Sequence, residues 1–208
     1  MKAAGEAGRS AQVRRARIED ADTVAALLHL SAADMYDRFA GGRDRAMRVL
    51  SRSVAEPGNA SSAEVVWVAE LGGEPVGAMA AFPVGEGRAR SRAFLRLALQ
   101  SAPPWHWPRA LYLFWVGGRA APSPPPSSLY IDALATAAGH RRRGVARALL
   151  AAAIDEARER DLPAVALDTT MTNEAARSLY TAVGFEEMAY RPPGRGLPGF
   201  VGLVKPLR

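Results

Sequence analysis

Six consecutive residues in the second half of the chain have the composition of an anion-binding turn. They are Arg141, Arg142, Arg143, Gly144, Val145 and Ala146. They stand between a predicted strand and the start of a predicted helix, where backbone amides lack carbonyl partners and the helix dipole adds positive potential. Small residues let a phosphate approach the backbone, and arginines supply charge and donors. The turn is therefore predicted to bind a diphosphate; the alternative is a basic helix start without a ligand.

Other phosphate and metal motifs do not fit this sequence. No Gly-Lys-Ser or Gly-Lys-Thr follows the turn, as a P-loop requires, and the three glycines of a dinucleotide fingerprint are missing. The chain has three scattered histidines and no cysteine, so no metal-ligand spacing is visible. The lack of cysteine also excludes disulfides and an acyl-cysteine intermediate.

Strands and helices alternate around the turn. The strands are predicted at 129–135, 164–168, 185–190 and 200–204, and the helices at 143–160 and 173–183. In the longer helix, apolar residues recur at the i, i+3, i+4 and i+7 spacing of one buried face. The run 121–128 contains four prolines and is predicted to be an extended connector, because proline has no amide hydrogen to donate.

The first half of the chain predicts helices followed by a hairpin. A strand at 12–17 precedes three helical stretches near 20–30, 32–39 and 46–50. Strands at 65–70 and 76–82 flank Leu-Gly-Gly-Glu-Pro, which is turn chemistry. An antiparallel hairpin ahead of alternating strands and helices predicts a mixed α/β sheet.

The segment 85–127 is the least informative part of the sequence. It opens with arginines and contains a predicted helix at 94–99. The apolar run 110–116 suits either a helix or a strand, because its length and spacing do not separate the two.

Length and composition are those of one soluble globular domain. The chain has 208 residues, of which 49% are hydrophobic and 23% charged. We predict a disordered lead-in at 1–10 and a single domain at 11–208. No apolar run approaches the roughly 20 residues that span a bilayer, and the basic N-terminus lacks the apolar core of a secretory signal. We therefore expect a cytoplasmic protein without a membrane partner.

The chain is basic, with a net charge of +6 and a pI near 10.3, and only two of its 27 basic residues are lysines. Such a balance would suit nucleic acid, an acidic surface or an anionic cofactor. The arginines are spread along the chain instead of being gathered with aromatic residues. A nucleic-acid partner is therefore not expected.

Several motifs together resemble the GNAT superfamily of N-acetyltransferases, in its bacterial type. Arg-x-x-Gly-x-Ala at 141–146 is similar to the family's acetyl-CoA motif, Arg/Gln-x-x-Gly-x-Gly/Ala. Tyr-Ile-Asp-Ala-Leu-Ala at 130–135 looks like its central strand. Asn-x-x-Ala-x-x-Leu-Tyr at 173–180 and Gly-Phe at 184–185 match its downstream signature, and the hairpin around 68–77 is also similar. The resemblance covers most of the chain outside 85–127.

The resemblance implies a fold and a cofactor site. The fold is a single α/β domain with a mixed, mostly antiparallel sheet of about seven strands, flanked by helices and splayed at the central strand, with an insertion at about 85–127. The donor is acetyl-CoA. Its pantetheine would pair with the strand edge at Leu134, Ala135 and Thr136, and its diphosphate would meet the amides of Arg141 to Ala146. Asn173 would contact the pantetheine arm; an asparagine there is also a favoured helix N-cap.

The resemblance also implies the catalytic residues. Tyr180 matches the family's general acid, which would protonate the leaving thiolate; the alternative is a tyrosine beside a core face of Ala176, Leu179 and Val183. An ammonium of pKa about 10 must lose a proton before it attacks. Asp132 is the predicted base, and Asp168 is an alternative. Glu70 and His106 are weaker candidates for the base.

The acceptor is expected to be the primary amine of a small molecule or peptide. Tyr36, Phe39 and the segment Trp105 to Trp107 could form its pocket, although an exposed aromatic cluster also suits a dimer contact or the core. A homodimer is one possible assembly. The alternative function is a CoA-binding or regulatory module without turnover, because a fold does not determine its function.

Overall fold

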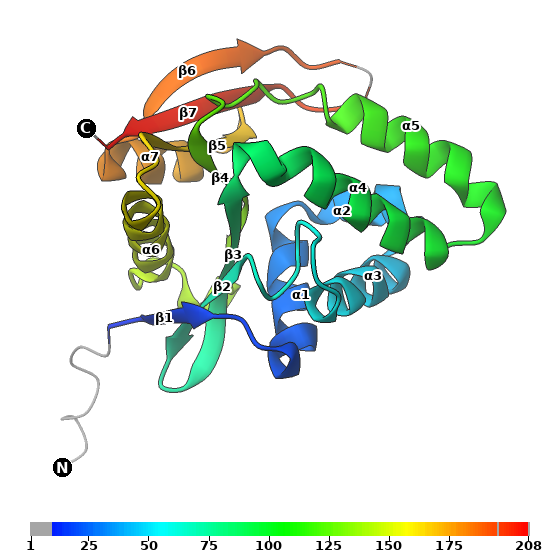
Figure 1. The fold of residues 1–208 in the computed structure, drawn as a ribbon, viewed down its shortest axis with the longest axis horizontal. Helices are drawn as coiled ribbons and strands as arrows, with labels where there is room; N and C mark the ends of the chain where they lie inside the picture. The colour runs from blue at the N-terminus through cyan, green and yellow to red at the C-terminus, as the bar shows by residue number, and fades with distance from the viewer. Residues whose placement is uncertain (1–9, 195, 208) are drawn as a thin grey trace.

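The computed structural model describes residues 10–194 and 196–207, so the lead-in predicted at 1–10 lies almost wholly outside the described residues. A seven-stranded sheet forms the centre of the molecule (Figure 1). In spatial order its strands are β1 (Gln12–Arg15), β2 (Val66–Leu71), β3 (Glu74–Pro83), β4 (Ser128–Thr136), β5 (Ala164–Thr170), β7 (Phe200–Pro206) and β6 (Glu186–Arg191). Only β4 and β5 run parallel; the other neighbours are antiparallel. The predicted mixed, mostly antiparallel sheet is confirmed.

Helices cover both faces of the sheet (Figure 1). They are α1 (Ala21–Ser31), α2 (Ala33–Ala40), α3 (Arg43–Ala55), α4 (Val84–Gln100), α5 (Trp107–Gly117), α6 (Val145–Glu159) and α7 (Glu174–Val183). Three short 3-10 turns are η1 (Ile18–Asp20), η2 (Pro104–His106) and η3 (Ala138–His140). The helices α6 and α7 lie on one side, and α1 to α4 lie on the other (Figure 1).

Each layer of helices has its own core against the sheet. On one side Leu149, Leu150 and Ala153 of α6 are fully buried against the sheet, as the helical spacing predicts. On the other side of the sheet, Leu28 of α1 and Leu50 of α3 pack against β2 and β3. The sheet is therefore held between two apolar layers, as a three-layer α/β fold requires.

The sheet is splayed at its centre. The parallel pairing of β4 with β5 extends from Ser128 opposite Ala164 to Ile131 opposite Leu167, and then stops. Beyond this point the register pairs β4 with β3 and β5 with β7. A bulge lies at the same place, because Ala80 pairs with Ala133 and Ala81 with Ile131, which leaves Asp132 as the extra residue. The predicted splay of the central strand is confirmed.

The segment 85–127 is more helical than its sequence indicates. The helix predicted at 94–99 is the second half of α4, which begins at Val84. Glycines at 85 and 87 hide the helical pattern there, and an ion pair of 2.7 Å between Arg90 and Glu86 supports that first half. The ambiguous run at 110–116 is the helix α5, and 121–128 is largely free of regular structure, as predicted.

Candidate active site

The turn before α6 has a backbone suited to an anion. Gly144 is the N-cap of α6 with φ +82°, and Arg142 also has a positive φ of 61°. Residues 141–144 are all exposed, whereas Val145 is buried in the core below them. Left-handed residues before a helix turn successive amides toward one side, where they form a concave site for an anion. The three arginines of the turn are therefore exposed at a helix N-terminus that solvent can reach.

The position of this helix end depends on a glycine in the neighbouring sheet. A Cβ at Gly77 of β3 would lie 2.5 Å from Cγ1 of Val145 and 3.2 Å from Cδ1 of Leu149. No side chain fits there unless the helix moves. The small residues of β3 thus allow the first turn of α6 to lie directly against the sheet.

The C-terminal part of β4 lies beside the splay and carries an unused polar atom. Leu134 and Thr136 are half-buried, and Ala135 is buried. The Oγ1 atom of Thr136 is buried without a hydrogen-bond partner; among the described residues only Nε1 of Trp67 shares this property. Buried polar atoms are almost always bonded, so this hydroxyl is available to a bound molecule. This observation fits the strand edge predicted to pair with pantetheine.

Asn173 caps α7. Its Oδ1 accepts a hydrogen bond of 3.3 Å from the amide of Ala176, and its Nδ2 donates to Oγ1 of Thr169 at 3.2 Å. This is the N-cap role that its residue type favours. The side chain is exposed, so contact with a ligand is compatible with the cap.

Tyr180 is the buried residue of α7, with 7% of its surface exposed. Its ring centroid lies 6.0 Å from that of Phe185. The sequence placed Tyr180 beside a core face of Ala176, Leu179 and Val183, but these three are only partly buried. Burial, together with the negative charge of Asp168, raises the pKa of Tyr180 to about 12. The phenol therefore keeps its proton at neutral pH and is close enough to Asp168 to feel its charge.

Two carboxylates meet where β4 and β5 diverge. Asp168 of β5 accepts a short hydrogen bond from the hydroxyl of Tyr130 on β4, and burial raises the pKa of Asp168. Asp132 is the bulge residue of β4 at the same point. Asp132 is exposed to solvent, but nearby protein atoms crowd its carboxyl; this partial burial and the charge of Asp168 raise the pKa of Asp132 to about 7. Near neutral pH it can therefore either accept or release a proton.

Aromatic side chains from the first helices lie on the Asp132 side. The pKa of Tyr36 in α2 is raised by burial and by the charge of Asp132, which places the two residues near one another. The Tyr36 ring lies edge-on to Phe94 of α4, with 6.5 Å between the ring centroids. Phe39 stacks on Phe94, with 6.2 Å between the centroids. The predicted pocket residues Tyr36 and Phe39 thus share an aromatic cluster close to the carboxylates.

Other sequence candidates lie apart from this site. Glu70 is held by Arg14 in an ion pair of 2.6 Å at the β1–β2 edge. His106 belongs to η2 and lies against Gly41, and Trp105 is 77% exposed on the same turn. The residue that the sequence missed is Tyr130. The signal was its place two residues before Asp132, because alternate residues of a strand share one face.

No group of three or more histidine, cysteine, aspartate and glutamate side chains in the described ranges could hold a metal ion. In the same part of the chain, no helix is long and apolar enough to cross a bilayer.

Comparisons with known proteins agree with this architecture. A model of the acetyltransferase (GNAT) family matches residues 33–185. An N-acetyltransferase from Staphylococcus aureus Mu50 is 20% identical with a TM-score of 0.74, over 93% of this chain and 99% of that one. A Bacillus subtilis acetyltransferase in complex with CoA is 14% identical with a TM-score of 0.56, over 96% and 100% of the two chains. The search of curated proteins found no match.

Proposed function

This chain belongs to the acetyltransferase (GNAT) family, and we propose that it transfers an acetyl group from acetyl-CoA to a primary amine. One observation carries the proposal. Where β4 and β5 diverge, a carboxyl with a pKa of about 7 lies in the same group of interacting side chains as a phenol with a pKa of about 12. Both pKa values are raised by burial, so the carboxyl can accept a proton near neutral pH while the phenol keeps its own, as a base and an acid in one reaction require. The anion-binding turn follows the same strand, β4.

The donor half of the site is proposed to hold acetyl-CoA in three places. The turn from Arg141 to Ala146 would bind the diphosphate with its amides and guanidinium groups. The edge of β4 at Leu134 to Thr136 would bond to the pantetheine, and the free hydroxyl of Thr136 offers a further contact. Asn173 would support the same arm from the start of α7. The solved Bacillus subtilis acetyltransferase with CoA shares this fold and supports the choice of ligand.

The reaction needs one acid and one base. The acceptor nitrogen attacks the thioester carbonyl carbon, the C–S bond breaks, and the sulfur leaves as a thiolate. Tyr180 would donate its phenolic proton to that sulfur as the C–S bond breaks, because its raised pKa keeps the phenol protonated at neutral pH. No covalent enzyme intermediate is required, and the chain has no cysteine to form a thioester.

Asp132 is proposed as the base that removes a proton from the incoming ammonium. Its pKa of about 7 matches the pH at which a base works best. Asp168 is already bonded to the hydroxyl of Tyr130. It is therefore better suited to orient the site and to raise the pKa of Asp132 than to take the proton itself.

Two measurements test the proposal together. Isothermal titration calorimetry with acetyl-CoA tests the donor site, and release of free CoA thiol across a panel of polyamines, amino acids and peptides tests transfer. We expect heat of binding, and thiol release with at least one amine. Binding without transfer to any amine would favour a non-catalytic CoA-binding module, and no heat would overturn the donor site.

A further inference from the structure

The α4–α5 hairpin, residues 84–119, forms a separate surface far from the anion-binding turn. In Figure 1 α5 lies at the edge of the molecule opposite α6 and α7. It packs on α2 and α4. None of the residues proposed above for acetyl-CoA belongs to the hairpin.

One side of α5 carries an exposed apolar stripe. Trp107, Leu111 and Trp115 recur every four residues and therefore share one side of the helix. They are 41%, 47% and 46% exposed, and Tyr112 beside them is 52% exposed. A water-soluble surface rarely gathers so many large apolar side chains unless something binds there.

The indole nitrogen of Trp107 already has hydrogen-bond partners in the protein. The Nε1 of Trp107 donates within the hairpin, to the carbonyls of Leu99 at 3.0 Å and Ala102 at 3.2 Å. The polar part of that indole is already satisfied, so the part that meets solvent is hydrocarbon. Trp115 carries the guanidinium of Arg119 over its ring at 4.4 Å, which places a cation beside the stripe.

The hairpin is strongly basic as well as apolar. It has six arginines and a single acidic residue, Glu86, which is paired with Arg90. Arg88, Arg92 and Arg96 are exposed at successive turns of α4. A row of free guanidinium groups therefore runs beside a row of aromatic and leucine side chains.

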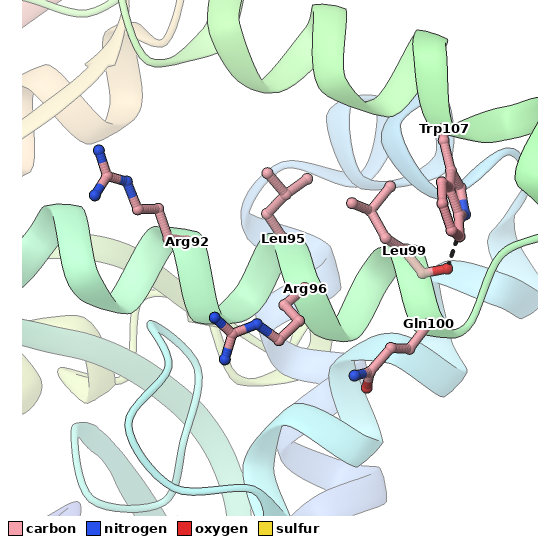
Figure 2. Close-up of a pocket in the computed structure, with 6 residues that line it drawn as sticks. All are labelled: Arg92, Leu95, Arg96, Leu99, Gln100 and Trp107. Carbon is pink, nitrogen blue, oxygen red and sulfur yellow. Dashed lines mark hydrogen bonds between the residues drawn. The ribbon is translucent and has the colours of Figure 1, made fainter.

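One open groove joins these two rows (Figure 2). Its volume is about 350 Å³, and it is lined by Leu95, Leu99 and Trp107 together with Arg92, Arg96 and Gln100. In Figure 2 Leu95 and Leu99 point from α4 toward Trp107 of α5, and Arg92 lies at the end of this apolar row, whereas Arg96 extends from the opposite side of α4. An acyl chain with an anionic head would match this distribution.

We propose that the α4–α5 hairpin docks on an anionic lipid bilayer surface. Short amphipathic helices with Trp and Leu on one side and arginines beside them bind at the headgroup boundary, with the rings inserted and the cations among the lipid phosphates. The sequence predicted no membrane partner because no apolar run spans a bilayer, but surface binding requires no such run. The proposal is independent of acetyl transfer.

Charge separates this occupant from two others. A second copy docked through the same face would bring two arginine-rich hairpins together, and like charges oppose such a contact. Nucleic acid would attract the arginines but leaves leucines without an apolar partner. An anionic bilayer satisfies both rows at once.

Vesicle flotation tests the docking surface, with folding of each variant checked by thermal melting. The protein is mixed with vesicles of phosphatidylcholine alone or of phosphatidylcholine with phosphatidylglycerol. We expect flotation only with the anionic vesicles, and release at high salt. Arg92→Gln/Arg96→Gln should lower partitioning on the order of tenfold, and Leu111→Gln should weaken it through the apolar stripe. The control Arg17→Gln/Arg158→Gln removes the same charge from exposed sites outside the hairpin and should float normally.

Tryptophan fluorescence provides a second measurement on the unmodified chain. Three of the four tryptophans lie on the hairpin, so insertion should shift the emission to the blue, and acyl-brominated lipids should quench it. Equal flotation with neutral vesicles, no flotation, or equal losses in control and test variants would each overturn the proposal. So would sedimentation that shows a dimer disrupted by Leu111→Gln, or binding to heparin but not to vesicles.

Discussion

Tyr180 and Asp132 show how one environment changes the protonation of two groups. Loss of hydration disfavours the charged form of each, so both pKa values rise. For the phenol, this keeps the proton in place at neutral pH, where it is available as the C–S bond breaks. For the carboxyl, it produces a base that is half-protonated near neutral pH. Neither shift is visible in the sequence, because both depend first on burial and then on the neighbouring charge of Asp168.

Removal of the phenolic hydroxyl tests the acid. Tyr180→Phe should lower kcat by roughly 10²- to 10⁴-fold, the usual contribution of a positioned acid, with little change in acetyl-CoA affinity. Steady-state thiol release and calorimetry measure the two quantities. Tyr190→Phe is the matched control, because Tyr190 is 56% exposed and bonded to Glu187. Full turnover by Tyr180→Phe would exclude this acid.

The base is tested by the pH dependence of turnover. Because the pKa of Asp132 is about 7, kcat/KM should rise as pH increases through that value and the carboxylate form accumulates. Asp132→Asn should lose both activity and this limb of the profile, whereas Asp155→Asn, at an exposed ion pair, should keep both. A limb that survives in Asp132→Asn would point to Asp168.

The same carboxyl is expected to cost stability. The folded protein binds the Asp132 proton more tightly than the unfolded chain does, because the pKa rises from 3.8 to about 7. Stability should therefore fall as pH rises between these values, and the deficit should persist above them. Asp132→Asn should raise Tm above pH 7 and lose that advantage near the lower value. A Tm difference that is independent of pH would contradict the raised pKa.

At the scale of elements, the position of α6 depends on the absence of a side chain at Gly77. Gly77→Ala would place a methyl group 2.5 Å from Val145 and push the first turn of α6 outward. We expect a loss of about 1–3 kcal/mol in unfolding free energy and weaker acetyl-CoA binding, measured by urea titration and calorimetry. Gly117→Ala meets no atom within 4 Å and should leave both unchanged. An unchanged unfolding free energy in Gly77→Ala would show that α6 can accommodate a methyl group beside Val145.

Regular elements were predictable where one period dominates. The buried face of α6 and the strands β2 to β4 follow directly from apolar spacing, and Gly144 marked the start of α6. The first half of α4 was missed because Gly85 and Gly87 break the pattern, and the α5 run was ambiguous because it is apolar on most sides. The bulge at Asp132 leaves no trace in sequence, since it arises from pairing with β3.

At the scale of the molecule, the sheet has two parts, β1 to β4 and β5 to β7. They are joined by four residue pairs between β4 and β5. The residues proposed for the donor half could be chosen from local motifs, because they lie close together in sequence, from 130 to 180. The aromatic and acidic group on the other side was not, since it joins α2, α4, β4 and β5 from distant positions. The sequence indicated Tyr36 and Phe39 as pocket residues, but it did not indicate Phe94, against which both rings lie.

Amide hydrogen exchange tests whether acetyl-CoA binds where the two parts of the sheet diverge. Peptides that cover 132–137 and 141–148 should exchange more slowly when acetyl-CoA is bound, because strand-edge and helix-end amides gain partners. A peptide from β1 should exchange at the same rate with and without the ligand. Protection confined to other segments, such as the α4–α5 hairpin, would place the ligand elsewhere.

The splay of the sheet also bears on how the protein should be handled. Beyond Ile131, β4 offers backbone groups beside the apolar residues Ala133 to Ala135. Such an edge is a template for an extended segment of another chain, and edges without charge are the ones that aggregate. A ligand lying along this edge would block that route. Preparations stored with CoA should therefore resist precipitation longer than those stored without it.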